Sequence, residues 1–66
     1  MGQGYGRELK RIVLASGCRF VRQGKGDHEI WYSPISDRTF TVDASVKKKY
    51  TAEASLKQAG VKERIK

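Results

Sequence analysis

The sequence predicts an α+β fold in which one helix, three strands and a second helix follow one another. Apolar residues recur at helical spacing near both ends, and the middle of the chain alternates apolar and polar residues between turn-forming segments. At 66 residues the chain has room for a single domain. Because a sheet and an amphipathic helix must each cover an apolar face, we expect a three-stranded antiparallel sheet with two helices on one face.

The first helix is predicted from Arg7 to about residue 16. Leu9, Ile12 and Val13 fall on one side of it, and Gly17 can adopt the left-handed conformation that ends many helices. Residues 1–6 contain three glycines, so they are expected to form a flexible N-terminus without a functional role.

Strands are predicted at residues 18–23, 27–33 and 39–42, with a glycine-rich turn at 24–26. Pro34 ends the second strand because proline cannot donate a hydrogen bond to a neighbouring strand.

Strand alternation places His28, Ile30 and Tyr32 on one face of the second strand, and Glu29 and Trp31 on the other. We take the face of Ile30 and Tyr32 as the one that the helices cover. His28 should then lie at the sheet edge, near the boundary of the core.

The second helix should begin at Thr51 as its N-cap, with Glu53 in the first turn, and run to about Gln58. Gly60 is the expected stop. We expect a domain of residues 7–61, followed by a charged tail, residues 62–66, that frays. The apolar stripe of this helix consists of Ala52, Leu56 and Ala59.

The composition indicates an anionic partner. Lys and Arg number 14 against 7 Asp and Glu, for a net charge of +7, which favours nucleic acid first, an acidic protein second and an anionic membrane third. No apolar stretch is long enough to span a bilayer or to resemble a secretory signal, and Cys18 is the only cysteine. We therefore expect a cytoplasmic protein, with Cys18 as a small core residue.

His28 is the candidate catalytic residue. An imidazole has an ordinary pKa of about 6.5, so near neutral pH it can accept a proton from a ribose 2′-hydroxyl or donate one to a leaving oxygen. RNA carries its own nucleophile, so this chemistry needs no metal or cofactor. The alternative is that a lone surface histidine has no catalytic role, which is the commoner case on composition alone.

Basic residues around His28 are candidates for contacts to RNA phosphates. Lys25 and Gly26 belong to the turn before it, and Arg22 precedes that turn. The run Lys47, Lys48 and Lys49 is a second basic segment, which could equally be a solvated linker. The segment around Lys25 lacks the full phosphate-loop pattern, and a plain hairpin turn is the alternative there.

The acidic and aromatic neighbours of His28 have weaker assignments. Asp27 and Glu29 flank it in sequence, but strand parity directs both away from the imidazole, so an acid pair with it is disfavoured. Of Trp31 and Tyr32, one should pack in the core while the other is free to stack on a base or a partner.

The chain resembles the HicA family of mRNA interferase toxins over residues 7–61. The resemblance lies in the opening helix, the segments GCRFVRQ at 17–23 and GKGDHEIW at 24–31, and the helix end LKQAGV at 56–61. It implies a fold like that of double-stranded-RNA-binding domains, a catalytic His28, a turn glycine at Gly26, metal-independent cleavage of mRNA and inhibition by a HicB-type antitoxin.

The chain departs from the family's pattern in two places. Asp27 stands where the family often has serine, which adds a negative charge beside the expected phosphate. Tyr50 precedes Thr51 where a glycine is usual, and residues 52–55 are smaller than is common. Besides the ribonuclease, a non-catalytic RNA-binding module and a module that only binds an acidic antitoxin remain alternatives. Cleavage that His28→Ala abolishes while binding is kept favours the ribonuclease, and binding without metal-free cutting favours the RNA-binding module. Loss of toxicity with no RNA binding at low salt points to the antitoxin-binding module.

Overall fold

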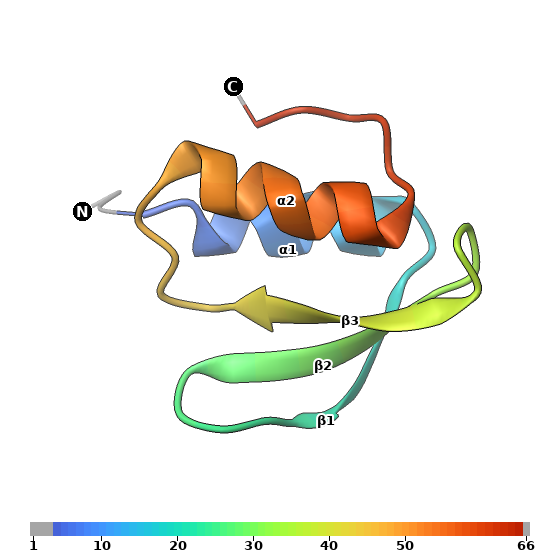
Figure 1. Ribbon diagram of the computed structural model, residues 1–66, viewed down its shortest axis with the longest axis horizontal. Helices are drawn as coiled ribbons and strands as arrows, with labels where there is room; N and C mark the ends of the chain where they lie inside the picture. The colour runs from blue at the N-terminus through green and yellow to red at the C-terminus, as the bar shows by residue number, and fades with distance from the viewer. Residues whose placement is uncertain (1–3, 66) are drawn as a thin grey trace.

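The computed structural model describes residues 4–65 and contains the predicted elements in the predicted order. The three strands form one antiparallel sheet in the order β1-β2-β3, and both helices lie on the same face of it (Figure 1). The α+β prediction is therefore confirmed. The elements are α1 (Gly6–Ala15), β1 (Arg19–Gln23), β2 (His28–Ser33), β3 (Arg38–Asp43) and α2 (Lys49–Ala59).

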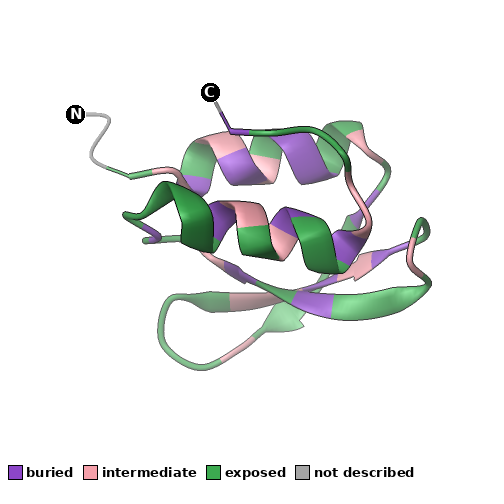
Figure 2. Ribbon diagram, turned by 45° about the horizontal axis from the view of Figure 1, so that its top comes forward, coloured by how far each residue is buried: buried purple, intermediate pink, exposed green. Residues whose placement is uncertain are grey.

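The core lies between the helices and the β3 side of the sheet. Both α1 and α2 contact β3, whereas every residue of β1 is exposed at the outer edge (Figure 2). Cys18 is buried in this core, as predicted. The apolar stripes of both helices are also buried, namely Leu9, Ile12 and Val13 of α1 and Ala52, Leu56 and Ala59 of α2.

The covered face of β2 is the opposite of the one predicted. Trp31 is 4% exposed and Ser33 is fully buried, whereas Ile30 and Tyr32 are only half-buried. Ser33 tolerates burial because its hydroxyl donates a hydrogen bond to the carbonyl oxygen of Ala59 at the end of α2. The expectation for Ile30 and Tyr32 was wrong, and the face that carries His28 is open.

Glu29 also lies on the covered face, where two hydrogen bonds stabilise its charged carboxylate. One carboxylate oxygen accepts from Lys10 Nζ of α1 at 2.9 Å, and the other accepts from Trp31 Nε1 at 3.0 Å. These bonds, that from Lys10 first, hold the pKa of Glu29 below its ordinary value. Lys10, Glu29 and Trp31 form a cluster that links β2 to α1 on the face of the sheet opposite His28.

The ends of the helices differ in part from the predictions. α2 begins at Lys49 after an extended Lys48, so Thr51 is not its N-cap and Glu53 lies beyond its first turn. Gly60 ends α2 in the left-handed conformation, with φ of 76°, as predicted. The tail after α2 was expected to fray, but Ile65 is 2% exposed in the core.

Residues 4–6 pack closely against the segment that follows β3. Tyr5 N donates to the carbonyl oxygen of Val46 at 2.8 Å. A Cβ added at Gly6 would lie 2.1 Å from the carbonyl oxygen of Ala44. The predicted flexibility therefore does not hold for this part of the N-terminal segment, and residues 1–3 lie outside the described part of the chain. Across residues 4–65, neither helix has the length and apolar character needed to cross a membrane.

Candidate active site

The turn between β1 and β2 holds His28 at the first position of β2. His28 N donates to the carbonyl oxygen of Lys25 at 3.0 Å, and Gly24 N donates to the carbonyl oxygen of His28 at 2.8 Å. The side-chain amide of Gln23 donates both to that same oxygen, at 2.9 Å, and to the carbonyl oxygen of Gly26, at 3.1 Å. The backbone of His28 is thus fixed while its side chain stays 53% exposed.

Two glycines allow this turn for different reasons. Gly26 has a φ of 60°, a conformation that residues with a side chain rarely adopt, which supports its prediction as the turn glycine. At Gly24 the constraint is space, because an added Cβ would lie 3.1 Å from the carbonyl oxygen of His28.

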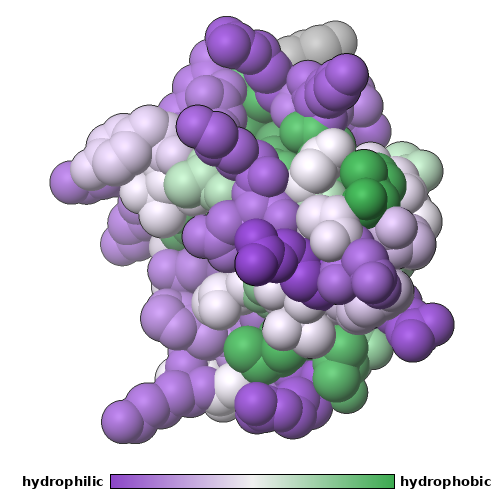
Figure 3. Space-filling model, turned by 45° about the vertical axis from the view of Figure 1, so that its right-hand side comes forward, coloured by the Kyte–Doolittle hydropathy of each residue, from purple (hydrophilic) through white to green (hydrophobic). Residues whose placement is uncertain are grey.

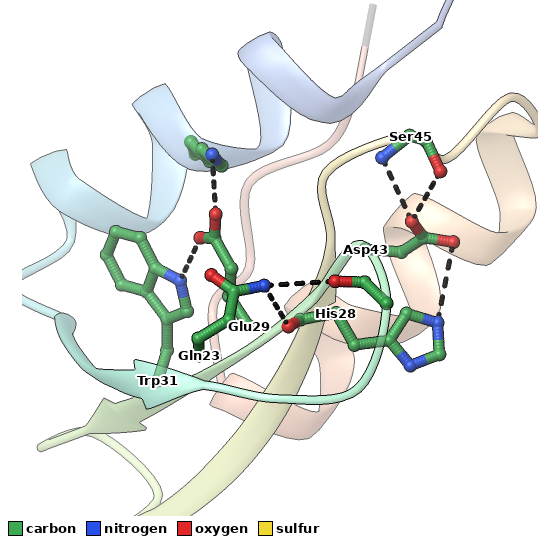
Figure 4. A network of polar contacts seen from close by, with 8 residues as sticks. Gln23, His28, Glu29, Trp31, Asp43 and Ser45 are labelled. Atoms are coloured by element: carbon green, nitrogen blue, oxygen red, sulfur yellow. Dashed lines mark hydrogen bonds and ion pairs between the residues drawn. The ribbon is translucent and has the colours of Figure 1, made fainter.

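Asp43 faces His28 across the sheet. The two residues are direct partners in the pairing of β2 with β3, so their side chains lie on the same face. His28 Nε2 lies 3.8 Å from Asp43 Oδ2, while Oδ1 accepts hydrogen bonds from the amide and the hydroxyl of Ser45, both at 2.9 Å (Figure 4). One carboxylate oxygen is thus occupied and the other is turned to the imidazole.

The Asp43 carboxylate is charged at neutral pH. The hydrogen bond from the backbone amide of Ser45, then that from its hydroxyl, lowers the pKa of Asp43, and the adjacent His28 lowers it further. The site therefore combines an exposed imidazole with an ionised carboxylate whose position is fixed.

A bulge in β1 places Arg22 on the face of His28. The pairing of β1 with β2 shifts between Phe20 and Arg22, so that Arg22 lies opposite Ile30. Without this shift Arg22 would lie opposite Glu29, on the covered side. The exposed guanidinium group therefore shares the open face with the imidazole.

The remaining predicted cations lie at the same end of the molecule. The turn with Lys25 and Gly26 lies at the end of the sheet where β3 finishes, and Ala44 N donates to Asp27 O between the two segments at 3.0 Å (Figure 1). The three lysines at 47–49 follow within six residues of Asp43 and are exposed. The structure thus gathers the predicted site residues around one end of the sheet.

The aromatic pair divides as predicted. Trp31 packs in the core with its ring edge-on to Phe20, at 6.1 Å between centroids. Tyr32 lies on the open face, where the Arg19 guanidinium carbon is 5.0 Å from its ring centre and its hydroxyl donates to Asp37. Tyr32 is therefore the aromatic side chain that shares the open face with His28, toward the other end of β2.

The sequence analysis missed Gln23, Asp43 and Ser45. Asp43 had a usable signal, because a four-residue turn at 34–37 pairs residues 33 and 38, and counting outward brings position 43 opposite His28. Gln23 had none, since its two hydrogen bonds depend on the conformation of the turn. Among residues 4–65 no three His, Cys, Asp or Glu side chains are grouped so that they could hold a metal ion.

Some apolar side chains are exposed as well. The large ones are Leu14, Phe20, Val21, Ile35 and Tyr50. Figure 3 shows the side of the molecule around the β2–β3 turn, where a mostly hydrophilic surface is broken by hydrophobic side chains.

The fold and the site together define a small basic α+β domain with one exposed histidine on its open sheet face. The family described as "HicA toxin of bacterial toxin-antitoxin" matches residues 6–61, and the chain belongs to this family. The comparison confirms the resemblance inferred from the sequence. Searches of curated proteins and of solved structures gave no significant match.

Proposed function

We propose that this toxin is an endoribonuclease that cleaves messenger RNA, with His28 exchanging protons with the substrate. The observation that supports the proposal is the placement of His28: its backbone is held by the turn, and its side chain is exposed at the basic end of an open sheet face. Membership of a toxin family agrees with an activity that harms the cell that makes it.

The proposed reaction uses the nucleophile that RNA carries. The imidazole accepts the proton of a ribose 2′-hydroxyl, the 2′-oxygen forms a bond to the adjacent phosphorus, and the bond from phosphorus to the 5′-oxygen breaks. The departing oxygen takes up a proton, and the products are a 2′,3′-cyclic phosphate and a 5′-hydroxyl. No metal ion takes part in these steps.

Cations near His28 would hold the RNA and stabilise the charge that develops on the phosphate. Lys25, Arg22 and the run of lysines at 47–49 have this role in the proposal, and Gly26 contributes its exposed backbone. A HicB-type antitoxin is the proposed inhibitory partner, and the cytoplasm, where messenger RNA is translated, is the proposed place of action.

The test compares wild type with His28→Ala on a labelled single-stranded RNA in the presence of EDTA. We expect the variant to lose at least about 100-fold in cleavage rate, the usual contribution of a general acid or base, while its RNA affinity stays close to that of the wild type. The wild-type product should carry a 2′,3′-cyclic phosphate, and 2′-O-methyl RNA should be bound but not cut.

Four outcomes would contradict the proposal. His28→Ala that cuts at the wild-type rate would exclude the catalytic role, and full inhibition by EDTA or products with only 5′-phosphate ends would exclude the reaction. Wild-type protein that binds RNA without cutting it would favour the non-catalytic RNA-binding module. Fluorescence of Trp31, the only tryptophan, checks that each variant is folded.

A further inference from the structure

The contact between Asp43 and His28 bears on how the imidazole reacts, not only on where it lies. His28 is the only histidine in the chain, and Asp43 is the carboxylate paired with it across the strands. The distance from Nε2 to Oδ2 is 3.8 Å, which is longer than a hydrogen bond but within the range of an ion pair. Hydrogen bonds in catalytic pairs are often long until substrate is bound.

The geometry points to Asp43 as a positioning residue that holds the imidazole of His28 through Nε2 and leaves Nδ1 to exchange the proton with RNA. This inference rests on the proposed ribonuclease function and goes beyond it, because it names the reacting nitrogen and the residue that selects it. Asp43 does not contact the substrate in this proposal and acts only through His28.

The choice of nitrogen follows from the hydrogen-bonding capacity of the two groups. A neutral imidazole has one N–H and one lone pair, and an ionised carboxylate can only accept. Facing Asp43 Oδ2, Nε2 is favoured as the protonated nitrogen, which leaves the lone pair on Nδ1. Figure 4 shows that Nδ1 is turned away from Asp43, and within residues 4–65 it has no hydrogen-bond partner.

Ser45 determines which carboxylate oxygen meets the imidazole. Both of its hydrogen bonds go to Oδ1, so the carboxylate cannot rotate freely, and Oδ2 remains turned to His28. Burial is too shallow to fix the pair by itself, because the side chains of His28 and Asp43 are 53% and 32% exposed. Hydrogen bonding, rather than packing, therefore orients the carboxylate.

The other charged groups near His28 do not offer the same contact. Asp27 precedes it, and among the described residues its side chain makes no hydrogen bond or ion pair. Lys25 lies in the same turn and is exposed to solvent. Asp43 is the carboxylate that faces the ring in this part of the chain.

Asp43→Asn is the discriminating variant. Its side-chain oxygen can still accept from Ser45, while an NH2 group replaces Oδ2 and donates toward Nε2. The lone pair is then drawn to Nε2, and Nδ1 carries the proton. Asp27→Asn removes the same charge from the residue next to His28 without touching the ring, and it is the matched control.

The measurement is a long-range ¹H–¹⁵N spectrum of the imidazole, recorded at a pH at which the nitrogen shifts show the neutral ring. A single histidine gives a single set of ring signals. We expect the Nε2–H tautomer in wild type and in Asp27→Asn, and a shift toward Nδ1–H in Asp43→Asn. Cleavage by Asp43→Asn should lose at least about tenfold in kcat, with KM changed less than about twofold.

Ser45→Ala provides a second variant with the carboxylate retained. It loses one of the two bonds to Oδ1, so we expect an intermediate tautomer ratio and a smaller loss in kcat than in Asp43→Asn. This variant also decides the matter if Asp43→Asn fails to fold.

Either of two results would overturn the inference: a wild-type ring protonated mainly at Nδ1, or a tautomer ratio and kcat that both variants leave unchanged. Failure of the proposed function has a different signature. Wild-type protein that cuts no RNA, yet shows the tautomer shift in Asp43→Asn, would refute the ribonuclease while leaving the carboxylate–imidazole pair in place.

Discussion

Asp27 brings a negative charge next to the proposed reacting imidazole. Its side chain is exposed and makes no hydrogen bond or ion pair among the described residues. The corresponding position is often serine in proteins that the sequence resembles. An uncompensated carboxylate beside the phosphate of a substrate raises the energy of the complex by Coulomb repulsion.

We predict that Asp27→Ser raises kcat/KM for RNA cleavage by about two- to fivefold at low salt. The gain should fall as salt is added, because exposed charges are screened over a Debye length of about 10 Å at 0.1 M. Initial rates on a short RNA at several salt concentrations would measure it. A gain of the same size at about 0.5 M salt, where the Debye length is much shorter, would show that the effect is not electrostatic.

The two faces of β2 carry side chains with different roles. His28 and Tyr32 lie on the open face, and Glu29, Trp31 and Ser33 on the face toward the helices. Glu29 belongs to the stabilising side, because its carboxylate joins Lys10 of α1 to the indole of Trp31.

We predict that Glu29→Gln destabilises the protein by about 1.5–3 kcal/mol at pH 7, the usual range for a hydrogen bond to a charged group. The depressed pKa of Glu29 means that its stabilisation is complete above the ordinary glutamate value of about 4.3 and is lost as the pH falls through the lower folded-state pKa. The free energy of unfolding of wild type should therefore fall in this acid range by an amount that Glu29→Gln does not lose, because the variant has no carboxylate at this position. Urea unfolding at pH 7 and at pH 3 measures both.

Glu53→Gln is the control for this prediction. Glu53 is half-buried on α2 and makes no hydrogen bond or ion pair among residues 4–65. Its substitution should leave the pH dependence of unfolding as in wild type. If Glu29→Gln and Glu53→Gln behaved alike, the cluster around Glu29 would have no special part in acid stability.

The order and approximate limits of the helices and strands could be predicted because periodicity and turn residues are local properties. The covered face of β2 could not. The placement of Glu29 and Ser33 on this face depends on partners from α1 and α2, and the sequence does not show that Lys10 and the carbonyl of Ala59 lie there. The start of α2 was misplaced because the prediction relied on Thr51 as a side-chain cap, whereas no side chain caps this helix.

The candidate site was predictable where it depended on neighbours in sequence and not where it depended on pairing. His28 and Gly26 follow from the turn itself. The position of Arg22 depends on a bulge in an exposed edge strand, for which the sequence carries no clear sign. Asp43 becomes visible only when the strands are aligned in the correct register.

Positive charge is distributed over the molecule, but the proposed RNA site uses one end of it. The lysines at 47–49 follow the end of β3, near the turn that holds His28, whereas Lys57, Lys62 and Arg64 line a shallow cleft between α2 and the tail. These two groups of three cations allow local binding of RNA to be separated from the effect of net charge.

We predict that replacing all three lysines at 47–49 by glutamine makes the slope of log affinity against log salt less negative by about 2, because each phosphate neutralised on single-stranded RNA contributes about −0.7 to it. The measurement is fluorescence anisotropy on a labelled RNA between about 50 and 200 mM salt. The control carries glutamine at Lys57, Lys62 and Arg64 and has the same net charge. Equal changes in slope for the two proteins would mean that RNA binding follows overall charge instead of a site.

The alternation along β2 also affects how a protein of this kind can diverge. Residues of the open face contribute little to the core, and exposed substitutions usually change stability by less than about 0.5 kcal/mol. Mutations at Arg22 or Thr41, which are exposed, can therefore accumulate without unfolding the domain, while those at Trp31 or Ser33 cannot. The proposed contacts on the open face can therefore change during evolution while the buried face keeps the fold constant.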